Sequence, residues 1–383
     1  MGRFNFSVLF VFSFLVIHSN NAVQANPTSL MFKAMRAWDE DSNKPQRYGR
    51  SGKGVGIAVI EGPHFNVDHP ALKGANITLI DLKKENNPNR GGTGKKLGHA
   101  NHVLALIAGQ PSNHEEAVDL PNLITIRRDN PDLENFYKQY NIPVPDFKYF
   151  GGLAPKAKIY AYPRTLEDDK GFDPDHFFNI LTDIKDKSDI HLINLSCKIE
   201  VNDKIIKLMN EIAESGKIFV QAAGNDSSIN VEPVDYRNGS KRSDFSETFK
   251  KHLVRVGALS CYPGGSKEDP STRVKIWTSK NGEGGSSYFT GEDTQGTFIF
   301  APGSCVLSAS HDVYYGLQSG TSMAAALVTG ALAGALEENL SQDKIQLLGR
   351  LSNTRSLTVN ENENESSSFK WLNLKSLWGS PTL

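Results

Sequence analysis

Short apolar runs alternate with amphipathic stretches along the chain from residue 54 onward. Five of the runs are typical of buried strands, and they span residues 55–60, 158–162, 190–196, 217–223 and 253–259. Helical patterns lie between several of them, so the strands are expected to be parallel and covered by helices on both faces. The predicted fold class is therefore α/β, a three-layer sandwich with a mostly parallel central sheet.

Capping residues locate two of the helices. Asp173-Pro174 is typical of a helix start, and Asn202 starts a second helix that Gly216 should end. The apolar positions expected to face inward are Phe177, Ile180, Leu181 and Ile184, and then Ile205, Leu208, Met209 and Ile212. Residues 323–336 are uncharged and crowded with Ala and Gly, which predicts a helix buried on all sides.

The N-terminus has the pattern of a signal peptide. Arg3 precedes an apolar run at residues 4–17, and small residues end at Ala25. We expect residues 1–25 to be removed, which leaves residues 26–53 as an N-terminal segment and makes the protein secreted or periplasmic. An uncleaved anchor is the alternative, although a membrane span needs about 20 residues.

A single domain is expected over residues 54–350. Two stretches, residues 110–150 and 262–296, are interpreted as surface insertions because each is longer than an ordinary connection. Residues 351–383 form a tail that is first polar. Its last part contains apolar residues that should dock on the domain, namely Trp371, Leu372, Leu374, Leu377 and Trp378.

The charge and cysteine content limit which binding partners and which disulfide or metal sites are expected. The 42 basic and 43 acidic residues give a net charge of −1, so no long-range field favours nucleic acid or an anionic membrane. The cysteines at 197, 261 and 305 allow at most one disulfide and show no zinc-ligand spacing. They are interpreted as small buried apolar residues.

Three motifs carry polar groups suited to nucleophilic catalysis. In Gly320-Thr321-Ser322-Met323-Ala324, a glycine turn presents Ser322 at a helix start, although a simple N-cap is the alternative. His99 lies at another predicted helix start and could act as a base, whereas His102, one turn later, is expected to be structural. Asn225 follows a predicted strand and could donate to an oxyanion, although a turn is the alternative.

Together and in this order, these motifs resemble the subtilisin-like serine proteases, the subtilase family, over about residues 50–350. The family's Gly-Thr-Ser-Met-Ala is unchanged at 320–324, its Ala-Ala-Gly-Asn lies at 222–225, and both histidines of its histidine motif are present. The resemblance implies that Ser322 is the nucleophile, His99 its base and Asn225 the oxyanion donor. It also implies a substrate-binding set formed by Ser196, Cys197, Lys198, Ala223 and Gly224.

The aspartate motif departs from the family. The strand that should end in Asp-Thr-Gly or Asp-Ser-Gly here ends in Glu61-Gly62-Pro63, and His69-Pro70 arrives one residue late. Glu61 keeps the charge that orients the histidine but adds a methylene. Asp68, in the following loop, is the alternative carboxylate. Lys198 replaces a family glycine, and it could favour acidic substrates or simply face solvent.

The expected function is that of a secreted serine endopeptidase acting on proteins or peptides. A pseudoprotease that only binds peptides is the alternative, because of Glu61 and because only residues 26–53 are available as a pro-segment. A metalloenzyme using His64, His69, His99 and His102 is a further alternative, but their spacing matches no strong metal motif. We expect no cofactor, and no Asp-x-Asp-x-Asp-Gly loop supports calcium. The sequence does not predict an oligomeric state.

Overall fold

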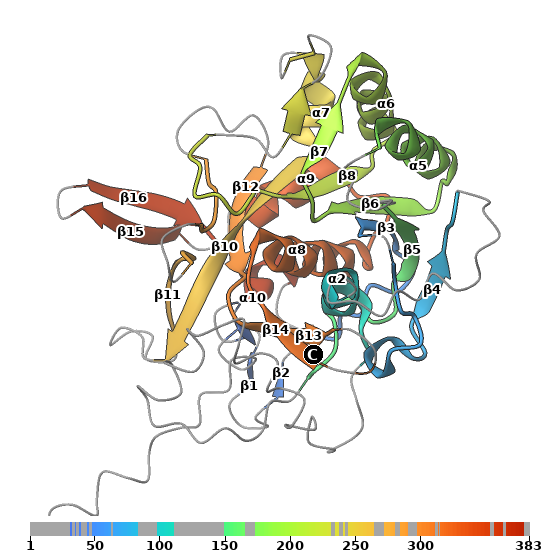
Figure 1. Ribbon diagram of the computed structural model, residues 1–383. Coiled ribbons are helices and arrows are strands. Elements are labelled where there is room, and N and C mark those ends of the chain that lie inside the picture. The colour runs from blue at the N-terminus through green and yellow to red at the C-terminus, as the bar shows by residue number, and fades with distance from the viewer. Residues whose placement is uncertain are drawn as a thin grey trace, which may run out of the picture.

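A central sheet with helices on both faces forms the core of the computed structural model (Figure 1). The structure describes residues 31–82, 98–110, 149–164, 173–263, 272–289, 297–362 and 365–378, with shorter gaps within these ranges. The expected signal peptide at residues 1–25 and most of the expected insertion at 110–150 lie outside the described residues.

Within the described residues, the sheet has eight strands, in the order β11-β10-β8-β6-β3-β5-β4 with β12 also paired to β10. All neighbouring strands are parallel except β10 and β11. The strands are β3 (Gly56–Glu61), β4 (Asn76–Leu79), β5 (Lys158–Pro163), β6 (Ile190–Leu195), β8 (Ile218–Ala222), β10 (Leu253–Pro263), β11 (Thr272–Ile276) and β12 (Thr297–Pro302). The five predicted strands and the α/β fold class are confirmed.

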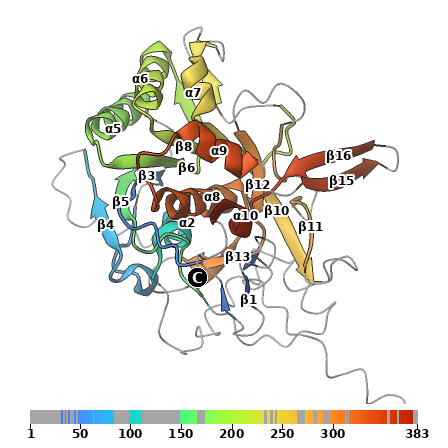
Figure 2. The same cartoon turned by 180° about the vertical axis from the view of Figure 1, so that it is seen from behind.

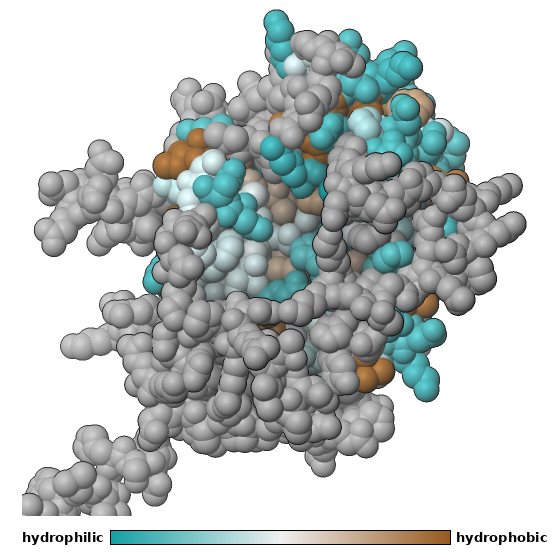
Figure 3. Space-filling view, viewed as in Figure 1, coloured by the Kyte–Doolittle hydropathy of each residue, from teal (hydrophilic) through white to brown (hydrophobic). Residues whose placement is uncertain are grey.

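Three helices cover one face of the sheet: α5 (Pro174–Asp186), α6 (Asp203–Glu214) and α7 (Glu247–Lys251). Asp173 and Asn202 cap α5 and α6 through their side chains, as predicted, and Gly216 follows α6 at a φ of 85°. The predicted inward positions of both helices are buried. Hydrophilic side chains gather on the outer surface over α5 and α6 (Figure 3), so both helices are amphipathic in the predicted sense.

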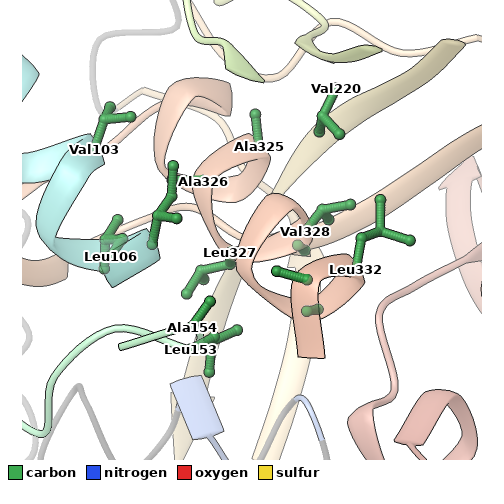
Figure 4. Packing of buried hydrophobic residues seen from close by; sticks show 14 of the residues in the cluster. Val103, Leu106, Leu153, Ala154, Val220, Ala325, Ala326, Leu327, Val328 and Leu332 are labelled. Carbon is green, nitrogen blue, oxygen red and sulfur yellow. The ribbon is translucent and has the colours of Figure 1, made fainter. Parts of the chain in front are cut away.

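The opposite face is covered by α2 (Gly98–Ala108) and α8 (Thr321–Leu336). Every residue of α8 is buried, as its composition predicts. Figure 4 shows Leu327 and Val328 of this helix among side chains from α2, β8 and the segment at Leu153. Close packing requires the glycines, because a Cβ at Gly330 would lie 2.8 Å from the Cβ of Leu153.

Helix α10 (Leu374–Trp378) packs against α8, and α9 (Lys344–Ser352) packs against α10 and β12 (Figure 2). The Trp378 indole lies against Gly334, where a Cβ would come within 2.8 Å of the ring, and its Nε1–H donates to the Ala331 carbonyl at 2.8 Å. The N-terminal segment packs nearby, since the Leu374 N–H donates to the Met35 carbonyl at 2.8 Å. Residues near both ends of the described chain therefore join the core around α8.

The remaining elements are short or peripheral. They are β1 (Trp38–Asp39), β2 (Lys44–Pro45), a 3-10 helix at Pro70–Leu72, β7 (Ile199–Val201), β9 (Val234–Tyr236), β13 (Val306–Ala309), β14 (Tyr315–Gln318), β15 (Ser356–Asn362) and β16 (Glu365–Lys370). The β15–β16 hairpin projects from the body of the protein in both ribbon views (Figures 1 and 2).

The interpretation of residues 262–296 as a surface insertion is wrong in part. Residues 272–276 form β11, an antiparallel strand of the main sheet. Ser286, Ser287 and Phe289 are buried, and the Ser287 N–H donates to the Gly224 carbonyl at 2.9 Å. The Gly, Ser and Lys content of this stretch concealed a segment that packs directly beside residue 224.

The interpretation of the cysteines as buried residues also needs correction. Cys197 and Cys305 are only partly buried. Cys261 lies in β10, and its side chain is outside the described part of the structure.

Candidate active site

The carboxyl ends of neighbouring parallel strands meet at one edge of the sheet, which is where ligands bind in open α/β folds. Glu61 is the last residue of β3, Ser196 follows β6, and Ala223 to Asn225 follow β8. The sheet order places these strands side by side as β8-β6-β3. Residues far apart in the sequence thus meet at this edge.

Glu61 makes direct contact with His99. The Glu61 side chain is 2 % exposed, and its Oε2 lies 2.9 Å from the His99 Nδ1. Because a carboxylate only accepts, the imidazole donates its Nδ1–H, which leaves Nε2 as the basic nitrogen. The Gly62 N–H also donates to Oε2, at 3.2 Å. Glu61 Oε1 is buried and has no hydrogen-bond partner in the described part of the chain.

The local charges act on His99 in opposite directions. Burial alone would lower the pKa of His99, but the charge of Glu61 and the hydrogen bond to it raise that pKa above its ordinary value. The guanidinium of Arg164 opposes the increase. The His99 side chain remains 41 % exposed, so it is accessible to a substrate.

Ser322 lies in the first turn of α8. Gly320 precedes the helix at a φ of 155°, and a Cβ there would lie 3.1 Å from Asn225 Nδ2, so the turn requires glycine. The Ser322 side chain is largely buried, and its hydroxyl donates to the Ser196 carbonyl at 3.0 Å. In return, the Ser196 hydroxyl donates to the Ser322 carbonyl at 3.2 Å.

Asn225 is fixed to the start of the same helix. Its Oδ1 accepts the Thr321 N–H and the Thr321 hydroxyl, both at 2.9 Å. Since the amide oxygen is engaged, the Nδ2 group remains as a donor beside residue 320. The Gly224 N–H donates to the same Thr321 hydroxyl at 3.1 Å. Thr321 therefore joins the end of β8 to the helix that carries Ser322.

The other members of the expected substrate-binding set surround this edge. Ala223 is buried, and its N–H donates to the Val256 carbonyl at 3.0 Å, whereas Lys198 is exposed. The exposure of Lys198 favours the solvent interpretation of its side chain. Burial and then the charge of Glu61 raise the pKa of the Cys197 thiol to about 11, which makes this thiol a poor nucleophile at neutral pH.

The remaining candidates lie in structural positions. Burial lowers the pKa of His102 to about 3, and its Nε2–H donates to the Val306 and Gly316 carbonyls at 2.8 and 3.2 Å. His69 is buried and caps the 3-10 helix through Nδ1, which accepts the Ala71 N–H at 3.0 Å. Asp68 is exposed, so the carboxylate in contact with His99 is Glu61. Within the described residues, no group of three metal-ligating side chains occurs.

Sequence reasoning missed Arg164, which directly follows β5. Its N–H donates to the Glu61 carbonyl at 2.6 Å, and its Nη1 donates to the Lys198 carbonyl at 3.0 Å. Arg164 thus crosses the end of β3 and joins the segments that follow β5 and β6. The signal was available, because a residue that follows a strand next to β3 must lie at the same edge of the sheet.

The α/β fold thus carries a histidine–carboxylate pair and a serine at the start of a buried helix. A family model described as the subtilase family, Peptidase S8, matches residues 52–370. The chain therefore belongs to the subtilase family of serine proteases. A comparison with curated proteins found no match. In the described part of the chain, no helix has the length and apolar character needed to cross a membrane.

Solved structures share the fold at low sequence identity. A chain of the subtilase cytotoxin SubAB assembly is 16 % identical, with a TM-score of 0.63 over 91 % of this chain and 95 % of that chain. The prenylagaramide maturation protease PagA is 17 % identical, with a TM-score of 0.56 over 88 % and 96 %. A cold adapted subtilisin-like serine proteinase is 18 % identical, with a TM-score of 0.52 over 90 % and 98 %. These likenesses establish the subtilisin-like fold.

Proposed function

We propose that the protein is a secreted serine endopeptidase in which Ser322 is the nucleophile, His99 the general base and Glu61 the carboxylate that orients His99. The observation that carries the proposal is the 2.9 Å contact between His99 Nδ1 and the buried Oε2 of Glu61. This contact fixes the tautomer in which Nε2 can accept a proton. Glu61 thus supplies the charge that the family aspartate would supply.

The proposed reaction proceeds through an acyl-enzyme. Ser322 Oγ attacks the peptide carbonyl while His99 Nε2 takes the hydroxyl proton, and the imidazolium then gives that proton to the leaving amine. Water attacks the ester by the same route in reverse order. Before the first attack, the Ser322 hydroxyl must leave the Ser196 carbonyl and turn toward His99.

Two donors are proposed to stabilise the oxyanion. Asn225 supplies its Nδ2–H, which the contacts of Oδ1 with Thr321 hold in orientation. Ser322 supplies its own N–H, because the first N–H groups of a helix have no intrahelical acceptor. Donors fixed before the reaction need little reorganisation in the transition state.

The substrate is proposed to be a protein or peptide bound along Ser196, Cys197, Lys198, Ala223 and Gly224, at the edge that holds Ser322. Secretion or export to a periplasm is proposed from the signal-like pattern of residues 1–25. The proposed mechanism uses no cofactor.

A pseudoprotease that binds peptides without cleaving them is the second candidate. Two observations favour it: the Ser322 hydroxyl donates to the Ser196 carbonyl, and the buried Oε1 of Glu61 has no hydrogen-bond partner among the described residues. An unsatisfied buried oxygen costs about 1–3 kcal/mol. In a pseudoprotease, the Ser322 hydroxyl would stay permanently bonded to the Ser196 carbonyl.

Labelling with a serine-directed phosphonate separates the two candidates. The wild-type protein should be labelled at Ser322, because the reagent requires an activated hydroxyl. Ser322→Ala is the negative control, and a peptide map should locate the label. Intact, folded wild-type protein that resists labelling and cleaves no member of a peptide panel would establish the pseudoprotease.

The pH at which activity is lost on the acid side should depend on the charge of Arg164. His99 must be neutral to act as a base, so activity should be lost as the pH falls through its raised pKa, which lies above the ordinary value of about 6.5. Arg164→Gln removes a charge that lowers this pKa, so the acid limb of kcat/KM should move to higher pH. A pH profile of peptide hydrolysis measures the shift.

Arg350→Gln is the matched control, because Arg350 of α9 is exposed and donates from Nη2 to the side chain of Gln342. Its acid limb should coincide with that of the wild type. A limb that moves to lower pH in Arg164→Gln would contradict the assignment of the limb to His99.

A further inference from the structure

Beneath the site, a polar side chain lies in an apolar part of the sheet. Asn194 of β6 is fully buried and pairs in register with Val59 of β3 and Val220 of β8. Side chains paired in this way point to the same face of the sheet, and both valines belong to the core under α8. A buried amide is costly there unless it is hydrogen-bonded.

Asn194 satisfies this requirement by joining α8 to the end of β6. Thr329, also fully buried, donates from Oγ1 to Asn194 Oδ1 at 2.9 Å. Asn194 Nδ2 in turn donates to Ser196 Oγ at 2.9 Å. The Ser196 hydroxyl then donates to the Ser322 carbonyl at 3.2 Å. Each group donates to the next, so the bonds form one chain that ends on the backbone of Ser322.

The two ends of this chain lie on the same helix. Thr329 is seven residues after Ser322 in α8, which is about two turns and places both on one face. The hydrogen bonds therefore fix the depth and rotation of the start of α8 against β6. Since β6 is the neighbour of β3, the same bonds fix Ser322 relative to the strand that ends in Glu61.

We propose that Thr329 and Asn194 are positioning residues that hold the backbone of Ser322 in place relative to the strand that ends in Glu61, the residue in contact with His99. The inference rests on the proposed function of Ser322 but concerns residues that do not touch the substrate. The single hydroxyl hydrogen of Thr329 is shared between Asn194 Oδ1 and the Ala325 carbonyl, which also lies 2.9 Å away. Loss of the hydroxyl leaves the backbone bonds of α8 in place but removes the bond between α8 and Asn194.

Thr329→Val tests the proposal, because valine keeps the shape of threonine and removes only the hydroxyl. Loss of one bond in the chain is expected to reduce kcat, and the rate of phosphonate labelling, by roughly threefold to tenfold with little change in KM. Thr329→Ser restores a hydroxyl and should recover most of the rate.

Thr182→Val is the matched control. Thr182 of α5 is exposed and donates to the Phe178 carbonyl at 2.9 Å, so the variant removes a similar bond within a helix but away from the site. Its labelling rate should equal that of the wild type. If Thr329→Val is labelled as fast as the wild type, the positioning role is wrong although the proposed function stands.

Hydrogen exchange gives a readout that does not depend on activity. If the chain of hydrogen bonds from Thr329 to Ser322 holds the start of α8, amide exchange should be faster in peptides covering residues 318–324 of Thr329→Val. Exchange in Thr182→Val should be unchanged. Unchanged exchange in both variants would overturn the proposed positioning role of Thr329 and Asn194. If the wild type resists labelling, the proposed function fails, and this measurement alone then decides whether Thr329 holds Ser322.

Discussion

Glu61→Gln is expected to reduce kcat by about 10⁴-fold, because it removes the charge that compensates the imidazolium of His99. The amide keeps the size of the side chain, so the loss would report charge and tautomer rather than packing. The contact to be broken is the one between Oε2 and His99 Nδ1 at 2.9 Å. Steady-state peptide hydrolysis, with labelling by the phosphonate as a second readout, measures the effect.

Two further variants sharpen this prediction. Glu61→Asp shortens the side chain by about 1.5 Å and so withdraws the carboxylate from its contact with His99 Nδ1. Because a displacement of about 1 Å can reduce the rate 10²-fold, this variant should also be slower than the wild type. Asp68→Asn should leave hydrolysis unchanged, because Asp68 is exposed and a different carboxylate contacts His99. A Glu61→Gln enzyme of full activity, together with an inactive Asp68→Asn enzyme, would reverse the assignment.

The second large effect is expected for His99→Ala, which should reduce kcat by about 10⁶-fold because no base then takes the proton of Ser322. The double variant Glu61→Gln/His99→Ala should be no slower than His99→Ala. The reason is that Glu61 acts only through the imidazole, so its contribution disappears with the ring.

Single-turnover rates of the two single variants and the double variant test this non-additivity. Thermal unfolding should confirm that all three are folded. If the double variant lost a further 10⁴-fold, the effect of Glu61 would be independent of His99, and the orienting role would be wrong.

The sequence was sufficient for the sheet and for the strands that carry the site. Glu61 and Asn225 are found from sequence because each stands directly at or after an apolar run, and such positions meet at one edge of a parallel sheet. The caps of α5 and α6 are equally local, since Asp173 and Asn202 each bond amides only two or three residues away. Short-range chemistry of this kind is readable without a structure.

The features that sequence reasoning missed depend on register and on packing. Thr329 is one of many small residues in α8, and only the alignment of α8 over β6 brings its hydroxyl to Asn194. Arg164 requires knowledge of which strand lies next to β3. The strand β11 was mistaken for an insertion because its edge position tolerates polar residues that obscure the apolar pattern.

The packing of Trp378 against Gly334 has a consequence for when the core around α8 can form during synthesis. The helix that carries Ser322 ends at Leu336, yet the indole that covers it and donates to the Ala331 carbonyl comes from residue 378. When the ribosome has synthesised α8, it has therefore not yet added Trp378, whose indole packs against this helix. Translation through Trp378 must precede completion of the core, so the nascent chain would carry all the proposed catalytic residues before the core around α8 is complete.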